Sequence, residues 1–420
     1  MPLRYRIPLG LLMALLGSPL WAAQKVNLDY HVRLMPQTGQ ADVRLTLAEG
    51  SAVRSLDFDL GAPGSYSDFK ADGGWQLTPD PQHSRGVWHP ASGTATLSYR
   101  VRLNHPFKNG SFDTYATAKW ALFRGEQLVP PASLDQQDGT ELVSRLTFAL
   151  PEGWKSVETA WPRIGKNRFR IDDVSRLFDR PTGWMLAGTL GSRRTTLGET
   201  EVTVAAPQGQ GMRRMDVLTL LTFVWPQVQA VFPRNPTKLL IVGAGSPMWK
   251  GASADRPMWK GASADRNSIY LSSALPMVSE SGSSPLLREL VQLFSGIKVE
   301  PGHDWISQGL SEYYAIELMR RAGGMSDERY QTLQHKLNAT GKGVTRMRGA
   351  QANPAAVARA VTLLQALDRE IRLQTHSKRS LDDVSQALMR MDKVNTQSFI
   401  QLSESVLGGA SEVLGTRLLE

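Results

Sequence analysis

Two different spacings of apolar residues divide this chain, and they limit the folds that it can adopt. From about residue 26 to residue 199, short runs of alternating apolar and polar residues are interrupted by Gly, Pro, Asn and Asp. In the segment 94–103, every second residue from Ala95 to Leu103 is apolar, which places these side chains on one face of a strand. Runs of this kind predict an antiparallel β-sandwich or saddle.

The second half of the chain changes to the spacing of helices. The segment 217–232 predicts a helix, 238–243 a buried strand and 267–272 an edge strand. The segment 286–296 is apolar around most of a helix surface, which is typical of a buried helix. From about residue 312 to the end the pattern is mainly helical. The 420 residues leave room for two or three domains of roughly 100–200 residues each.

The N-terminal segment 1–23 has the pattern of a Sec-type secretory signal peptide. Arg4 and Arg6 precede an apolar run at 9–16, and Ala22 and Ala23 offer a cleavage site. The run is too short to span a bilayer, and we expect no membrane span after the signal is removed. We therefore expect a periplasmic or secreted bacterial protein; the alternative is an uncleaved anchor.

Composition limits the partners of the chain. It has no Cys, so no disulfide constrains it. Its net charge of +9 comes from Lys and Arg that are scattered among Asp and Glu. We interpret this charge as a source of solubility and of general attraction to anionic surfaces, and we expect no nucleic-acid partner.

Several phrases occur in an order that turn chemistry alone does not explain. They are Leu-Pro-Glu-Gly-Trp-Lys at 150–155, Ile-Asp-Asp-Val-Ser-Arg-Leu-Phe-Asp-Arg-Pro at 171–181, Leu-Asp-Arg-Glu-Ile-Arg at 367–372 and Lys-Arg-Ser-Leu-Asp-Asp-Val at 378–384. Each phrase alone could be a turn or a helix start. Together they resemble the glycyl aminopeptidase family of gluzincin metallopeptidases, from about residue 142 to the end of the chain.

The resemblance implies an α+β fold with three parts. After the signal peptide at 1–23, we expect an N-terminal antiparallel β domain at 24–205 and a thermolysin-like zincin domain at 206–320. A helical region would follow at 321–420. Residues 247–256 and 257–266 are identical copies. A repeat this short is no solenoid, and we interpret it as a replication slip or an artefact that a surface loop tolerates.

The resemblance also identifies the positions of the zinc site, and their residue types do not suit zinc. Arg288 and Gln292 lie where the two His ligands of a His-Glu-x-x-His helix would be, and Gln308 lies where the third ligand, a Glu, would be. Arg offers no lone pair, and a neutral Gln amide is a poor zinc ligand. Glu289, at the position of the general base, is kept. We expect no metal and no cofactor.

Other positions that the resemblance assigns to chemistry also differ. The family has a Glu near the amino terminus of the substrate and a Tyr that stabilises an oxyanion. Ala264 lies at the position of the Glu, with Asp265 at the neighbouring His, and Val357 lies at the position of the Tyr. The differences therefore extend beyond the metal ligands.

A charged residue on a mostly apolar helix needs a partner. We expect the Arg288 guanidinium to occupy the former metal position and to pair with Glu289 or Glu312. The alternative is that Arg288 and Glu289 are solvated at a helix edge. His303 lies in the loop before the segment that carries Gln308. It could act as a substitute metal ligand, although a lone loop His is more often structural.

Three functions fit these patterns. The first is an exported, catalytically inactive metallopeptidase homologue that binds a peptide or protein in the inherited cleft. The second is a structural role, with the cleft filled by Arg288 and its partners. The third is an active aminopeptidase-type hydrolase with a non-standard metal centre around Glu289 and His303. Ligand chemistry favours the first two.

Overall fold

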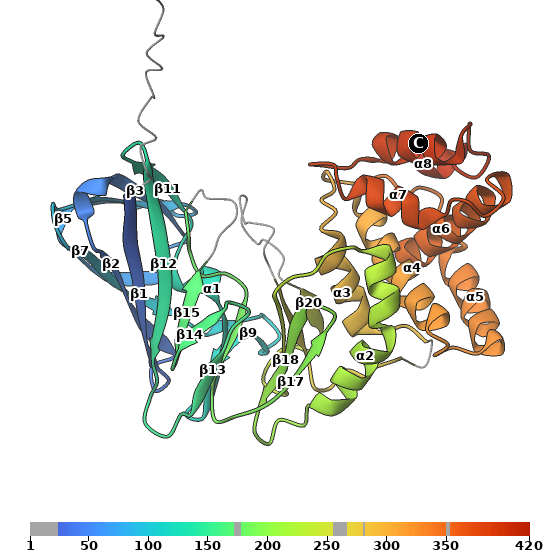
Figure 1. Cartoon of the computed structure of the whole chain (residues 1–420). Helices are drawn as coiled ribbons and strands as arrows, with labels where there is room; N and C mark the ends of the chain where they lie inside the picture. The colour runs from blue at the N-terminus through green and yellow to red at the C-terminus, as the bar shows by residue number, and fades with distance from the viewer. Residues whose placement is uncertain (1–23, 172–177, 255–266, 280–281, 350–352) are drawn as a thin grey trace, which may run out of the picture.

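The computed structural model describes residues 24–171, 178–254, 267–279, 282–349 and 353–420 (Figure 1). The expected signal peptide, the second copy of the repeat, Ala264 and Asp265 lie outside these residues. Strands fill the N-terminal half and helices the C-terminal part, with a further sheet between them. The expected α+β class is confirmed. No helix of the described residues is both long and apolar enough to cross a membrane.

The N-terminal part of the described chain holds three sheets. The first has the strand order β14 (Arg163–Gly165), β15 (Arg168–Ile171), β12 (Thr140–Ala149), β1 (Gln24–Met35), β2 (Gln40–Leu47), β7 (Ala95–Arg102), β4 (Tyr66–Ala71). The second has the order β13 (Ser156–Glu158), β16 (Trp184–Gly188), β10 (Trp120–Arg124), β9 (Phe112–Ala116), β8 (His105–Pro106). The third has the order β11 (Ala132–Gln136), β3 (Val53–Gly61), β6 (Ser84–Pro90), β5 (Gly73–Thr78).

Alternation in the sequence becomes alternation of burial in these strands. Ala95, Leu97, Tyr99 and Val101 of β7 are all at most 3% exposed, as the period of two predicts. They share one core with side chains of the third sheet such as Trp88. One pairing differs from the antiparallel expectation, because β1 and β12 run parallel.

A fourth sheet links the two halves of the molecule. Its order is β17 (Leu190–Leu197), β18 (Thr200–Pro207), β19 (Lys238–Val242), β21 (Ser268–Leu271), β20 (Ala252–Ala254). The expected domain boundary between residues 205 and 206 therefore falls inside β18. The segment 267–272 was expected to form the edge strand, and this is wrong: β21 lies between β19 and β20, and β20 forms the edge.

The first copy of the repeat is part of this framework and not only a surface loop, which corrects our expectation for the repeat. It supplies β20, and its Met248 is 3% exposed. The Trp249 backbone N–H donates to the Phe112 carbonyl oxygen at 3.0 Å, which ties this segment to β9. Met248 also belongs to an apolar layer between the second and fourth sheets that includes Trp184 and Tyr270.

Helices cover the other face of the fourth sheet and form the C-terminal part (Figure 1). They are α2 (Arg214–Val231), α3 (Pro285–Ser295), α4 (Asp304–Arg321), α5 (Asp327–Gly341), α6 (Pro354–Gln374), α7 (Leu381–Leu388) and α8 (Thr396–Leu407). A short α1 (Gly125–Leu128) lies in the N-terminal part, and 3-10 turns occur at Gly50–Ala52 and Arg417–Leu419. Ser380 caps α7 in a capping box with Asp383.

Candidate functional site

The first site helix, α3, begins and ends at the residues that its sequence marks. The Ser284 hydroxyl accepts a hydrogen bond from the Leu287 backbone N–H at 3.4 Å, and Pro285 follows at the start of the helix. Gly296 ends the helix with φ of 59°, a conformation that suits glycine. The apolar side chains of α3, Leu286, Leu287, Leu290, Val291, Leu293 and Phe294, are buried. This burial fixes the rotation of α3 and leaves Arg288 and Gln292 half-buried, one turn apart.

The second site helix, α4, packs between α3 and α6. A Cβ atom at Gly309 would lie 2.6 Å from the Cβ of Ala360, so α4 and α6 can approach closely only because this residue is Gly. Gln308 and Glu312 lie one turn apart on α4, and both are half-buried. They therefore share the face of α4 that carries the contact with Arg288.

Arg288 forms an ion pair between the two helices. Its Nε lies 3.6 Å from Oε2 of Glu312, with the side chains 41% and 12% exposed. Glu312 is one of the two partners that we expected. This carboxylate oxygen makes no hydrogen bond in the described structure, so the ion pair is its main polar contact. The interface thus holds a cation and an anion that neutralise each other.

Glu289 is buried in this helix pair. It is 2% exposed, so the interpretation of Glu289 as a solvated helix-edge residue is wrong. A buried carboxylate is retained at the position that the resemblance gives to the general base.

The residues at the expected ligand positions do not suit a zinc ion. Arg288 has no lone pair to donate, and Gln292 and Gln308 offer neutral amides. Among the residues that the structure describes, no three His, Cys, Asp or Glu side chains form a group that could hold a metal. The three positions on α3 and α4 therefore supply no imidazole, thiolate or carboxylate donor.

His303 has a structural environment at the start of α4. It is 8% exposed, and its Nδ1 accepts from the Thr396 backbone N–H at 3.1 Å. The Thr396 hydroxyl lies 2.8 Å from the same nitrogen and accepts from Trp305 Nε1 at 3.1 Å. The His303 ring thus ties α4 to α8. In the described chain, His303 and Glu289 belong to no metal-binding group of three such residues.

Of the remaining expected site positions, the structure describes Val357. Val357 is half-buried in the first turn of α6, and its backbone N–H donates to the Asn353 carbonyl oxygen at 3.0 Å. The structure does not describe Ala264 and Asp265. The described edge strand comes instead from the first copy of the repeat, where Ala254 pairs with Ile269 of β21.

A cavity of about 760 Å³ lies where the N-terminal part meets the fourth sheet. It is lined by residues of the segments 107–111, 245–250 and 272–274. Phe107 and Trp249 give it aromatic walls, and Lys250 gives it one positive charge. The cavity is thus lined by the residues that directly follow β21 and by those that precede β20 in the sequence.

A polar network behind α4 was not recognised from the sequence. Both Nη atoms of Arg321 donate to the Asp382 carboxylate, at 2.7 and 3.1 Å, and the Tyr314 hydroxyl donates to it at 3.0 Å. Burial raises the pKa of the Tyr314 phenol well above its ordinary value. Burial also raises the pKa of Glu317, against the opposing charge of Arg321. Arg321 and Tyr314 are 61 and 68 positions from Asp382 in the sequence, so residue spacing gives no signal for the network.

Comparisons with known proteins identify the fold. No protein-family model matches the chain, and no curated protein matches it. Among solved structures, an aminopeptidase N family protein from Idiomarina loihiensis is similar, with TM-score 0.63, 15% identity, and 92% of this chain and 72% of that chain covered. A variant of an M1 zinc metallopeptidase from Deinococcus radiodurans, bound to a Tyr-Ser-Ala substrate, has TM-score 0.58, 14% identity, and 94% of each chain covered. The chain therefore has the fold of the M1 zinc metallopeptidases and aminopeptidase N family proteins.

Proposed function

We propose that this chain is an exported homologue of the M1 zinc metallopeptidases that has lost peptidase chemistry and binds a peptide or a segment of a protein. The observation that carries the proposal is the ion pair between Arg288 and Glu312. It lies at the junction of α3 and α4, where the resemblance puts the zinc ligands. A guanidinium at this point both fails to bind zinc and repels a cation.

The chemistry of peptide hydrolysis supports the loss of activity. A zinc peptidase needs three protein ligands so that the metal polarises a carbonyl and lowers the pKa of a water molecule. Glu289 alone supplies a base without an activated water. No hydrolytic step can therefore be derived from the residues on α3 and α4.

The cavity at the junction of the N-terminal part and the fourth sheet supports peptide binding. Its aromatic walls, Phe107 and Trp249, suit an apolar side chain, and Lys250 suits a carboxylate. The similar Deinococcus radiodurans protein was solved with a tripeptide substrate. A purely structural role is the second candidate, favoured by the ion pair that occupies the junction of α3 and α4.

Metal content and turnover test the loss of chemistry. We expect the purified protein to contain no stoichiometric zinc by mass spectrometry. We also expect it to cleave aminoacyl-coumarin substrates no faster than its Glu289→Gln variant. Bound zinc that is lost in Glu289→Ala, together with turnover that is lost in Glu289→Gln, would overturn the proposal in favour of an active non-standard metal centre.

Calorimetric titration with the tripeptide Tyr-Ser-Ala separates peptide binding from a structural role. We expect binding that Phe107→Ala weakens, because Phe107 lines the cavity and is 46% exposed. Leu373→Ala is the matched control, since Leu373 is 78% exposed on α6 and outside the cavity. Equal affinity of the two variants, or no binding by the unmodified protein, would leave the structural role as the better account.

Export is a separate part of the proposal and rests on the sequence pattern of residues 1–23. Mass spectrometry of the chain recovered from a periplasmic fraction should find a mature N-terminus near Ala22 or Ala23. An intact Met1 in that fraction would instead indicate an uncleaved anchor.

A further inference from the structure

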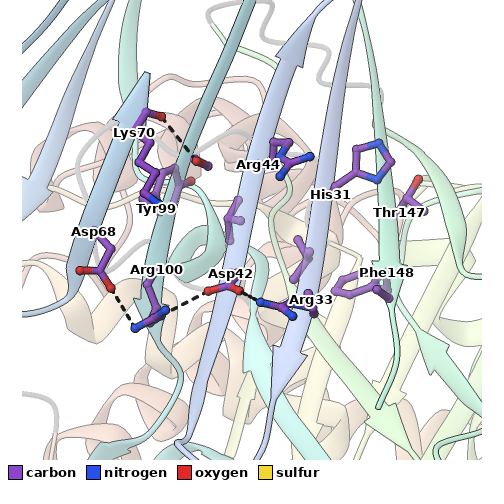
Figure 2. Close-up of a pocket in the computed structure, with 14 residues that line it drawn as sticks. His31, Arg33, Asp42, Arg44, Asp68, Lys70, Tyr99, Arg100, Thr147 and Phe148 are labelled. Carbon is purple, nitrogen blue, oxygen red and sulfur yellow. Dashed lines mark hydrogen bonds and ion pairs between the residues drawn. The ribbon is translucent and has the colours of Figure 1, made fainter. Parts of the chain in front are cut away.

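The outward face of the first sheet carries a row of basic and hydroxyl side chains that includes no carboxylate. Side chains of alternate residues point outward, so the strand register places them in rows across β12, β1, β2, β7 and β4. His31 lies opposite Arg44 on β2 and Thr147 on β12. Arg44 lies opposite Ser98 on β7, which in turn lies opposite Lys70 on β4. We call these five residues the cationic row; Figure 2 labels four of them, Thr147, His31, Arg44 and Lys70.

The neighbouring row on the same face is internally neutralised. Asp42 pairs with Arg33 on one side, and Arg100 Nε lies 3.2 Å from it on the other. Arg100 Nη1 also lies 2.9 Å from Asp68 (Figure 2). This row alternates cation and carboxylate across four strands. It shows how this face binds a carboxylate, by holding it between two guanidinium groups.

The cationic row has no such internal partners. Within the described part of the chain, Arg44 and Lys70 form no ion pair, and both are exposed. The nearest carboxylate along β1 is Asp29, which already lies 3.7 Å from Arg145 and 3.9 Å from Arg168. Thr147 lies at the β12 end of the row, where its hydroxyl can donate a hydrogen bond to an anion. Ser98 lies between Arg44 and Lys70, and its hydroxyl donates to the Lys70 carbonyl oxygen at 3.5 Å. Two permanent charges and a His therefore face solvent, and the carboxylates nearest to them on this face are already paired with other arginines.

Both rows line one cavity of about 630 Å³. Neighbouring strands are about 4.8 Å apart, so the cationic row spans roughly 19 Å from β12 to β4. An extended peptide rises about 3.3 Å per residue, so five or six residues span this length. Alternate side chains of such a peptide are about 6.6 Å apart. The long Arg and Lys side chains can extend from their strands to contact them.

We propose that the cationic row is a docking site for an extended acidic segment of another protein, lying across the strands. The ligand supplies the carboxylates that the neighbouring row already contains. A planar anionic bilayer fits less well, because the row lines a hollow rather than a flat surface. The site is remote in sequence from α3 and α4, and the proposal holds whether or not the peptidase chemistry is lost.

Fluorescence anisotropy with a labelled Glu-Ser-Glu-Ser-Glu-Ser peptide tests the docking site. We expect binding that weakens with added salt and that is not seen with the Gln-Ser-Gln-Ser-Gln-Ser peptide. The double variant Arg44→Gln with Lys70→Gln should lose about tenfold in affinity, since it removes two charged contacts. Both side chains are exposed, so the thermal melting temperature should not change.

The matched control removes one Arg and one Lys elsewhere. Arg390→Gln with Lys336→Gln changes the net charge equally, at exposed positions in the helical part. We expect this control to keep the affinity of the unmodified protein within about twofold. Equal losses in the two double variants would overturn the proposal, because binding would then follow net charge alone. Binding to phosphatidylglycerol vesicles but not to the acidic peptide would overturn it in favour of a lipid surface.

Discussion

Arg288 on α3 and Arg44 on β2 both lie on the polar side of a regular element, but their surroundings differ. Arg288 lies between two helices and pairs with Glu312, whose side chain is 12% exposed. Arg44 lies in the cationic row, which faces solvent, and it forms no ion pair within the described chain. The helix junction has neutralised its charges internally, whereas the sheet face has not.

The difference follows from the cost of removing a charge from water. A charge enclosed between helices loses hydration, so it is kept only with a partner. A charge on an open sheet face keeps its hydration and needs none. Unpaired surface cations thus lower the stability of the fold little and remain available to a ligand. The two regions can be distinguished by what happens to stability when each Arg is removed.

Removal of the two arginines should give the largest contrast in stability. We expect Arg288→Met to lower the free energy of unfolding by about 1 kcal/mol, because it leaves the Glu312 carboxylate unpaired in a mostly buried place. Arg44→Met should change it by no more than about 0.5 kcal/mol. Urea denaturation of both variants measures this. Equal effects would show that the ion pair of the helix junction is not distinct from a surface charge.

Smaller effects on stability, with opposite dependence on pH, are expected from Glu317 in the helical part and from Asp42 on the sheet face. Burial raises the pKa of Glu317 on α4 above its ordinary value of 4.5, although the charge of Arg321 opposes this. Burial would also raise the pKa of Asp42 on β2, but the hydrogen bonds from Arg33 and Arg100 hold it below its ordinary value of 3.8.

These shifts predict opposite responses to pH. Folded Glu317 keeps its proton where the unfolded chain has lost it, so the protein loses stability as the pH rises above about 4.5, and Glu317→Gln should abolish that loss. The contribution of Asp42 is complete above pH 3.8 and is lost as the pH falls through its lower folded value. Asp42→Asn should remove this acid-side loss. Denaturation at a series of pH values checks both; the same slope in each variant as in the unmodified protein would contradict the assignments.

Patterns that act within one element were readable from the sequence. The alternation from Ala95 onward predicted the buried face of β7, because the period of a strand fixes which side chains share a face. Ser284, Pro285 and Gly296 mark the ends of α3 through local backbone chemistry. Glu312 was named with Glu289 as a partner of Arg288 because a charge on a mostly apolar helix needs one, and Glu312 forms the ion pair.

Pairings between distant segments were not readable. The two copies of the repeat are identical, so the sequence does not say which one forms β20 beside β21. The parallel pairing of β1 with β12 joins residues more than a hundred positions apart. The cationic row depends on the register of several strands, which places His31, Arg44 and Lys70 together although each is unremarkable in its own segment.

The zinc content of a restored site tests the central claim most directly. The variant Arg288→His, Gln292→His and Gln308→Glu rebuilds the three ligands on α3 and α4. If these positions are the remnant of a peptidase centre, the triple variant should bind about one zinc ion per chain while the unmodified protein binds none. A double variant that keeps Gln308 is the control and should bind zinc more weakly. A triple variant that folds, by circular dichroism, but binds no zinc would show that the positions do not converge, and would contradict the account.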